Sequence, residues 1–429
     1  MEKLEKTLFV ESTELVNING DSNVPTALCY LESGKCFGYA ALEKSEGNIV
    51  NTEFKVDLGE YDLQNTSKKN KMFETAEGGE KSSFELAKDF INMILDNVEG
   101  QAILPAYDRK GLKILVSEPL AFQIEDRGKS WIKNYRDNIE RILHRYDIVE
   151  FLPEPFAVYQ YYRYGLKIPQ LLEASKQVAL IIDFGGGTFD VSVIESTRTG
   201  DISKKGKFAN PLSASSEPFG GFFINEKIAE YLILRRFESD SEKRKSSQFF
   251  KTYLRYKKGE LDFDALNDEK KSFIRNIKKL SRNVEAKKIE LCKKIVNWDL
   301  KADCYEKVLI EVPDNPYIGN SKWHTVSLFG HELRTIFRNE IWEPRIKKVL
   351  KSAISRAKES LKDKHITITL ISGGSSNIRW LEKFIIEEFK DDLGRAAPIP
   401  LSQSFQEIVA KGLAIECARR HYDPDSEFV

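Results

Sequence analysis

The sequence has few cysteines and histidines, no net charge and no long apolar run. The five cysteines, at positions 29, 36, 292, 304 and 417, include no Cys-x-x-Cys pair, which excludes a disulfide-rich small scaffold. The five histidines stand far apart without the spacing of metal ligands, so we expect surface or core histidines. Lysine and arginine together number 66, and so do aspartate and glutamate. This balance argues against a dedicated binder of nucleic acid or of anionic lipid.

No segment approaches the run of about 18 apolar residues that a membrane-spanning helix needs. The charged start, Met1-Glu-Lys-Leu-Glu-Lys6, also differs from a signal peptide. We therefore predict a cytoplasmic protein whose partners include no membrane and no nucleic acid. Of the 429 residues 41% are apolar and 31% charged, which suits two or three domains with large cores and solvated helices.

Strand and helix patterns alternate along the chain, which predicts an α/β protein. Two strands joined by a turn are predicted over 24–40, and a flexible polar loop over 65–82. Further strands are predicted at 113–117, where we expect burial, and at 178–182, 191–194, 307–312 and 366–371. Helices are predicted from Ser82 or Ser83 to 98, over 131–144, over most of 225–295, at 378–389, and over 344–361 with Pro344 in the first turn.

The most informative segment is Asp183-Phe-Gly-Gly-Gly-Thr-Phe-Asp190, between two apolar strands. Three successive glycines have no Cβ atoms, so backbone N–H groups can approach a ligand closely. Such a nest of donors suits phosphate oxygens, and Thr188 adds a hydroxyl. Asp183 and Asp190 flank the turn with carboxylates that can hold the hydration shell of Mg²⁺. Since a plain hairpin needs only about two turn residues, we interpret the segment as a phosphate site.

Two other phosphate signatures are incomplete. Asp183-Phe-Gly185 matches the magnesium tripeptide of protein kinases, but no His-Arg-Asp loop or Gly-x-Gly-x-x-Gly loop precedes it. Gly128-Lys-Ser130 matches the end of a Walker A loop, but Gln123 occupies the position of the required first glycine. Neither signature supports a function.

Two more glycine turns stand before predicted helices. Gly373-Gly374-Ser375-Ser376 follows a buried strand, and Gly220-Gly221 precedes a helix that we expect to begin near Asn225. The N-terminus of a helix offers free N–H groups and positive potential, which suit a phosphate or a ribose. Each turn alone would be an ordinary loop, but three of them in one α/β chain indicate a nucleotide cleft.

The segment 183–193 resembles the second phosphate motif of the seventy-kilodalton heat-shock proteins, the DnaK-type chaperones of the actin-like ATPase superfamily. Other segments resemble further motifs of this family in the same order: Val116-Ser-Glu-Pro119, Glu154-Pro-Phe-Ala157 with Tyr164-Gly165, Phe219-Gly-Gly221 and Ile371-Ser-Gly-Gly-Ser-Ser-Asn-Ile378. The resemblance extends from about Asn19 to Ala418, which corresponds to the family's nucleotide-binding region.

The resemblance implies a two-lobed actin-like ATPase fold, which is ribonuclease H-like, with ATP or ADP and Mg²⁺ bound between the lobes. Lobe I would comprise 1–168, completed by 405–420, and lobe II would comprise 176–396 with a helical subdomain at 225–295. The implied activity is Mg²⁺-dependent ATP hydrolysis of the DnaK-like chaperone class, by in-line attack of water on the γ-phosphate. Co-chaperones or a nucleotide-exchange factor are the implied partners besides the nucleotide.

The resemblance also implies a role for individual residues. The catalytic group would be Lys55, Glu154, Asp183 and Thr188, with Lys55 stabilising charge on the transferred phosphoryl group. Nucleotide contacts would come from Gly185, Gly186, Gly187, Thr188, Gly220, Gly221, Lys287, Gly373, Gly374 and Ser375. The metal would be held through water by Asp183 and Asp190.

The sequence departs from the family in several places. The family's first phosphate loop, Asp-Leu-Gly-Thr-Thr, has no counterpart before Asn19, and nothing matches the peptide-binding domain or its linker. Other residues stand where the family usually has Glu, Arg and Asp, namely Val284 (with Glu285 adjacent), Asn377 and Gln406. Either the start is truncated, which we expect, or the chain is a degenerate nucleotide sensor or assembly protein without turnover.

Overall fold

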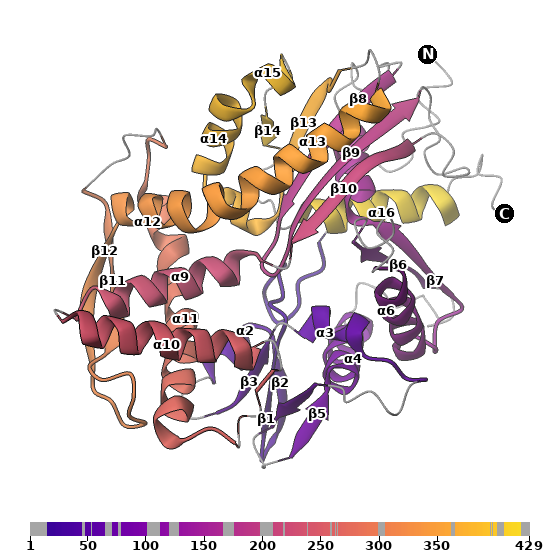
Figure 1. Ribbon diagram of the computed structural model, residues 1–429. Helices are drawn as coiled ribbons and strands as arrows, with labels where there is room; N and C mark the ends of the chain where they lie inside the picture. The colour runs from indigo at the N-terminus through magenta and orange to yellow at the C-terminus, as the bar shows by residue number, and fades with distance from the viewer. Residues whose placement is uncertain are drawn as a thin grey trace.

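The computed structural model describes residues 15–421 apart from 45–47, 53, 65–70, 76–78, 101–111, 120–127, 166–175, 198–208, 218, 238, 258–259, 262, 264, 299–304, 362–364, 395, 397 and 401–406. Helices and strands alternate along the chain and pack together, so the protein is of the α/β type, as the sequence predicts (Figure 1).

The largest sheet has five strands in the order β10-β9-β8-β13-β14. Its strands are β8 (Lys176–Phe184), β9 (Phe189–Thr197), β10 (Ala209–Glu217), β13 (Ile368–Ser372) and β14 (Pro398–Pro400). Of these described strands, β9 alone runs opposite to the others. β8 and β9 form the predicted hairpin through a short turn, whereas a parallel neighbour such as β13 requires a long crossover. The continuous apolar run 178–182 is buried, as expected of a strand covered on both faces, and so are Asp183 and Phe184.

Three helices occupy the region predicted to be mostly helical. They are α9 (Gly221–Leu234), α10 (Asp240–Lys257) and α11 (Asp268–Lys294). The side chain of Asn267 caps α11 by accepting a hydrogen bond of 3.1 Å from the Lys270 N–H. α11 packs against α9 and against a two-stranded sheet made of β11 (Lys307–Pro313) and β12 (Trp323–Phe329).

The helix predicted for 344–361 begins earlier than its proline suggests. Three segments follow one another without a break: α12 (Gly330–Ile336), the π-helix η3 (Phe337–Ile346) and α13 (Lys347–Leu361). Pro344 lies inside η3, so its predicted place in a first turn is wrong. A proline has no N–H group to donate to the helix, and its ring crowds the preceding turn. The wider π turn accommodates both the missing hydrogen bond and the ring.

The first part of the chain contains a small sheet with the order β2-β1-β3. The strands of this sheet are β1 (Ala27–Leu31), β2 (Gly34–Phe37) and β3 (Val50–Thr52). The helices of this part of the chain are α2 (Tyr39–Glu43), α3 (Phe54–Glu60) and α4 (Ser83–Gly100). The loop predicted for 65–82 is partly wrong, since β4 (Met72–Glu74) pairs with β5 (Glu80–Ser82), while 65–70 and 76–78 lie outside the described residues. Ser82 and Glu85 cap α4 reciprocally, which confirms the predicted start of this helix.

Two parallel strands, β6 (Lys113–Glu118) and β7 (Ile148–Pro153), flank α6 (Gly128–Ile142) in sequence. β7 continues into α7 (Glu154–Gln160) and the π-helix η2 (Tyr161–Gly165). The expected burial of β6 is wrong for most of the strand, because Lys113 to Ser117 are only half-buried. Glu118 is the exception, and its carboxylate is paired with Arg136 of α6.

The last helix, α16 (Ile408–His421), packs against β6 and α7. In Figure 1 it runs between the five-stranded sheet and the β6–β7 pair. The remaining elements after β13 are η4 (Gly374–Asn377), α14 (Trp380–Glu388) and α15 (Lys390–Leu393). α16 is thereby joined to the segment around β7 and α7, far away in sequence.

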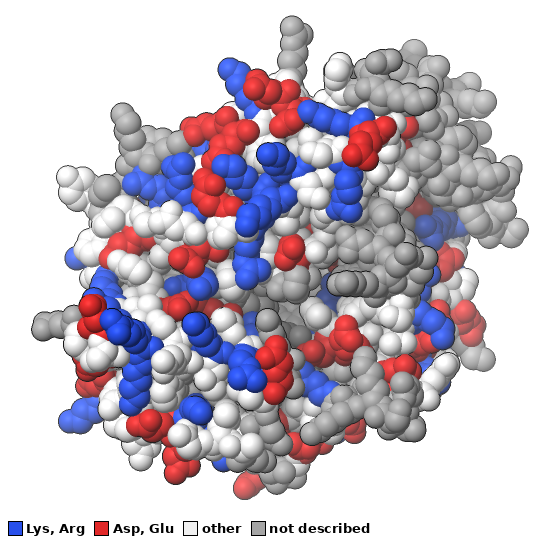
Figure 2. Space-filling model, in the orientation of Figure 1, with Lys and Arg blue, Asp and Glu red and all other residues white. Residues whose placement is uncertain are grey.

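Two large clusters of buried apolar side chains hold these elements together. One surrounds the five-stranded sheet and includes residues of α9, α11 and α13. The other lies under β1 and β2 and includes residues of α3, α4 and α6. On the face seen in Figure 2, lysine and arginine alternate with aspartate and glutamate, which agrees with the balanced charge of the sequence. Within the described residues, no helix combines the length and the apolar character that crossing a membrane requires.

The contact between α16 and α7 depends on a glycine. A Cβ atom on Gly412 would lie 1.9 Å from the carbonyl oxygen of Ala157. We therefore expect Gly412→Ala to lower the free energy of unfolding by about 1–3 kcal/mol, although alanine is the better helix former. Urea denaturation measures the change. Gly100→Ala is the control, because a Cβ there meets nothing within 4 Å, and equal stability of the two variants would contradict the prediction.

Candidate functional site

The three glycine turns singled out in the sequence meet at one place in the structure. The N–H groups of Gly221 and Phe222 donate hydrogen bonds to the carbonyl oxygens of Gly185 and Gly186, at 3.0 and 2.9 Å. The hydroxyl of Ser375 donates to the same Gly185 carbonyl at 2.8 Å. The β8–β9 turn, the start of α9 and the start of η4 are thus tied together, although the sequence separates them widely.

Two of these glycines are required by close backbone contacts. A Cβ atom on Gly220 would lie 2.5 Å from the carbonyl group of Gly186. Gly373 has φ +87°, and a Cβ there would lie 2.4 Å from the carboxylate of Asp183. Any larger residue would push the turns apart, so the close approach of the turns requires glycine at positions 220 and 373.

The tip of the β8–β9 turn is accessible to solvent. The Gly185 N–H closes the turn by donating to the Thr188 carbonyl at 3.0 Å. Gly186 and Gly187 are exposed, and a Cβ on Gly187 would meet nothing within 4 Å. A ligand therefore has room to approach the backbone at these two residues.

A group of charged side chains lies beside the turn. The Lys55 ammonium of α3 is paired with the Glu154 carboxylate at 2.9 Å, and Ser117 at the end of β6 donates to the same oxygen at 3.2 Å. Glu154 is the first residue of α7, where the helix dipole favours a negative charge. Burial acts to raise the pKa of Glu154, but the charge and hydrogen bonds of Lys55 and Ser117 outweigh it and lower the pKa. The charge of Glu154 in turn raises the pKa of Lys55.

The two aspartates of the motif face each other across the hairpin. Asp183 and Asp190 are directly opposite in the β8–β9 register, and each is less than a tenth exposed. Burial, and then the charges of Glu154 and Asp190, raise the pKa of Asp183 well above its ordinary value. Burial and Glu154 also raise the pKa of Asp190 from 3.8 to about 6, against hydrogen bonds from Ser216 and Thr188. Two buried like charges at this position are unfavourable unless a cation offsets them.

The donor set fits a magnesium ion held through water. The Oδ1 atom of Asp190 is buried and has no hydrogen-bond partner among the described residues. Nowhere in the described residues do three His, Cys, Asp or Glu side chains come close enough to enclose a metal directly. Mg²⁺ prefers one or two carboxylates with several waters and substrate phosphates, so the aspartate pair suits it.

Lys288, and not Lys287, contacts the residues of the glycine turns. The side chain of Lys287 is 42% exposed and its ammonium pairs with Glu290 at 2.8 Å. Lys288 is 4% exposed, lies 3.4 Å from the Gly221 carbonyl, and pairs with Glu285 at 2.8 Å. The predicted place of Lys287 beside the glycine turns is therefore wrong. One step along a helix turns the side chain by about 100°, so a shift of one residue moves it to another face.

The position of Glu285 resolves one of the apparent departures in the sequence. Its carboxylate accepts hydrogen bonds from Lys288 and from the Asn225 side chain of α9. Val284, by contrast, is fully buried in the core. Burial acts to raise the pKa of Glu285, but Lys288 and Asn225 lower it overall. Glu285, and not Val284, thus lies at the glycine turns.

The other predicted residues are distributed as follows. Thr188 and Gly374 lie in the turns, and Ser375 is buried at the contact with Gly185. Asn377 is exposed and its side chain donates to the Gly374 carbonyl at 2.9 Å. Gln406 lies outside the described residues.

Sequence reasoning missed four residues of the site, namely Ser117, Asn225, Glu285 and Lys288. Ser117 lies in one of the family-like segments and Glu285 beside the noted departure at Val284, but neither was assigned to the site, and Lys288 left a signal of its own in the sequence. It falls on the apolar stripe of α11 between Val284 and Leu291, where a charged residue is out of place unless it has a partner.

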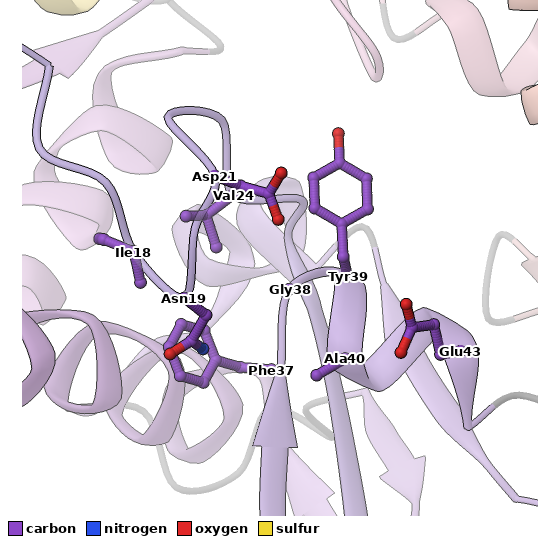
Figure 3. A pocket seen from close by; sticks show the side chains of 9 residues that line it. All are labelled: Ile18, Asn19, Asp21, Val24, Phe37, Gly38, Tyr39, Ala40 and Glu43. Carbon is purple, nitrogen blue, oxygen red and sulfur yellow. The ribbon is translucent and has the colours of Figure 1, made fainter.

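A pocket of about 150 Å³ lies elsewhere, at the start of β1 and the end of β2 (Figure 3). All of its lining residues fall between Ile18 and Glu43, and none belongs to the glycine turns or to the aspartate pair. Apolar side chains and the polar side chains of Asn19, Asp21 and Glu43 line it together. The pocket is therefore distinct from the site described above.

No protein-family model and no curated protein matches the chain. The resemblance noted in the sequence consequently rests on short motifs and on their order. The geometry around the glycine turns is the observation that bears on function.

The close contact of Gly220 with Gly186 can be tested by substitution. We expect Gly220→Ala to lower the free energy of unfolding by about 1–3 kcal/mol, because the new Cβ overlaps backbone atoms that cannot move away. Gly187→Ala, in the neighbouring β8–β9 turn but in open space, is the matched control and leaves stability nearly unchanged. Urea denaturation of both variants compares them, and an unaffected Gly220→Ala would show that the turns are not packed as described.

The aspartate pair predicts a gain of stability on neutralisation. Because the folded pKa of Asp190, about 6, exceeds its ordinary value of 3.8, the ionised form destabilises the fold. Asp190→Asn should therefore raise the free energy of unfolding at pH 7 without Mg²⁺ by about 2 kcal/mol.

The stability gained by Asp190→Asn should depend on pH, because the destabilisation comes from the ionised carboxylate. The penalty is fully present above pH 6 and absent below the ordinary value, so the gain shrinks as the pH falls toward 4. Chemical denaturation at pH 7 and at pH 4 measures it. A gain that is equal at both values, or a loss at pH 7, would rule out this electrostatic origin.

Proposed function

We propose that the chain is an ATP-binding, Mg²⁺-dependent ATPase module of the DnaK-like chaperone class. The observation that carries the proposal is the meeting of three glycine turns beside a buried aspartate pair and the Lys55–Glu154 ion pair. Exposed glycine backbone, a lysine held by a carboxylate and a buried pair of aspartates are the groups that recognise a phosphate chain with its metal ion.

The fold supports the same proposal. The sheet order β10-β9-β8-β13-β14, with β9 alone antiparallel among the described strands, is what we would expect of a ribonuclease H-like lobe. We propose that 176–396 form this lobe II, with 225–295 as its helical subdomain. Segment 1–168 would form lobe I of the actin-like arrangement, completed by 405–420, because α16 packs on β6 and α7.

In this proposal the phosphates lie at the exposed end of the β8–β9 turn. The backbone N–H groups of Gly186 and Gly187 would bind phosphate oxygens, with Thr188 beside them. The aspartate pair would hold Mg²⁺ through water, and the ion would neutralise charge on the phosphates. Glu154, fixed by Lys55 and Ser117, would accept a hydrogen bond from the attacking water and orient it.

The adenosine would lie on the other side of the turns. Gly221, Lys288 and Ser375, which lie close together, would contact it, with Gly374 beside Ser375. The Asn225–Glu285–Lys288 network holds polar side chains in fixed positions, as recognition of a ribose requires. The partners of such a module would be the nucleotide and, for a chaperone of this class in the cytoplasm, co-chaperones or an exchange factor.

A second candidate function is nucleotide binding without turnover. One observation favours it: the charge of Lys55 is already neutralised by Glu154 at 2.9 Å. If this ion pair persists when nucleotide binds, the lysine cannot stabilise charge on the γ-phosphoryl group. The protein would then act as a nucleotide sensor.

The test measures binding and hydrolysis separately. ATP with Mg²⁺ should raise the midpoint of thermal unfolding, and phosphate should be released slowly. Lys55→Ala and Asp183→Asn should lower kcat at least about 100-fold and change the Kd for ATP by less than about tenfold, because both groups act on the transferred phosphoryl group.

Two lysines provide matched controls. Lys71 pairs with Asp57 on the same helix as Lys55, so Lys71→Ala should leave kcat unchanged. Lys287→Ala should leave the Kd for ATP unchanged, whereas Lys288→Ala should raise it. A thermal shift without phosphate release would select the second candidate function, and the absence of both would refute the nucleotide site.

A further inference from the structure

Two cysteines lie opposite each other on neighbouring strands of the small sheet. In the antiparallel register of β1 and β2, Cys29 is the partner of Cys36. Directly opposite residues of an antiparallel pair project to the same face of the sheet. Both cysteines are in the reduced form, and the Cys29 thiol donates to the Tyr30 carbonyl at 3.9 Å.

The backbone geometry suits a disulfide at this pair. The Gly38 N–H donates to the Ala27 carbonyl at 2.9 Å, which makes 27 and 38 a hydrogen-bonded pair. Because such pairs alternate along an antiparallel ladder, 29 and 36 are also a hydrogen-bonded pair, with Cα atoms about 5.5 Å apart. This separation lies inside the range that disulfides span, about 4.4–6.8 Å.

The two thiols differ in access. Cys29 is fully buried against Ala27 and Ala41, whereas Cys36 is half-exposed. Burial, and then Cys36, raise the pKa of Cys29 to about 11, while the positive charge of Arg282 on α11 acts to lower it. An oxidant from solution would therefore meet Cys36 first, and Cys29 is placed to react second.

We propose that Cys29 and Cys36 form a reversible dithiol–disulfide site, oxidised by low-molecular-weight disulfides of the glutathione type. The Cys36 thiolate attacks one sulfur of the oxidant, whose S–S bond breaks and releases one thiolate, which takes up the proton that Cys36 lost. The Cys29 thiol then loses its proton and attacks the Cys36 sulfur, which releases the second thiol. The protein gives up two electrons and two protons, and one oxidised glutathione becomes two reduced ones.

Oxidation of the two thiols would add a covalent link between β1 and β2. A disulfide ties β1 to β2 next to Phe37 and Gly38, which line the pocket of Figure 3. It also consumes the thiol on which the charge of Arg282 acts. This inference is independent of the proposed ATPase function, because the chemistry needs only the two thiols and the oxidant.

The experiment exposes the reduced full chain to oxidised glutathione and then traps free thiols by alkylation. Mass spectrometry should show a chain that has lost two hydrogen atoms, with Cys29 and Cys36 linked in one disulfide-bonded peptide. Cys292, Cys304 and Cys417 should be alkylated. Reduced glutathione in excess should restore alkylation of both linked cysteines.

Single variants test the order of the two steps. Cys29→Ala should stop at a glutathione adduct on Cys36, and Cys36→Ser should leave Cys29 unreacted. Arg282→Gln should slow the conversion of the adduct to the disulfide several-fold, while Lys278→Gln, an exposed change on the same helix, should not. A wild-type chain that keeps the adduct without closing it, or that links another pair of cysteines, would overturn the proposal.

Discussion

The arrangement of the site depends on contact between backbone and backbone at three glycine turns. The carbonyl groups of Gly185 and Gly186 accept hydrogen bonds from the first turn of α9, and Ser375 binds one of them from the other side. This approach is possible because Gly220 has no Cβ that would touch Gly186. Through these few contacts the β8–β9 hairpin, α9 and the end of β13 have a fixed relation, and the charged side chains beside them are placed accordingly.

The same place is electrostatically unfavourable in the absence of a cation. Asp183 and Asp190 are buried opposite each other, near the negative charge of Glu154. Lys55 and Ser117 satisfy Glu154, but one oxygen of Asp190 has no partner among the described residues. Buried carboxylates with raised pKa values cluster where a protein binds ligands more often than where it only needs stability. The charge arrangement and the exposed glycine backbone therefore support the same proposal, a ligand made of an anion and a divalent cation.

One long helix connects the glycine turns to the small sheet. α11 presents Lys288 and Glu285 to the glycine turns, and Arg282, less than two turns earlier, acts on Cys29 of β1. These residues lie along a stripe that is otherwise apolar and packed against α9 and β11. Because the helix is continuous from Asp268 to Lys294, a change at the β1–β2 hairpin and a ligand at the glycine turns would act on the same rigid element.

The sequence by itself determined the features that depend on neighbouring residues. The β8–β9 hairpin and the cap of α4 at Ser82 follow from short patterns, and the structure confirms them. The other two glycine segments are also found where strand passes to helix, but α9 begins at Gly221 and not near Asn225, and 374–377 form η4 themselves. Tertiary structure decided what depends on distant contacts. Lys288 rather than Lys287 faces the turns because the packing of α11 sets which side of the helix is buried. Pro344 lies within a helix because the π turn accommodates it, and β4 pairs with β5 despite a polar sequence. The sequence predicted a shared cleft for the three turns, but the contacts between them could not be read from the chain, since they arise only when the crossover brings β13 beside β8.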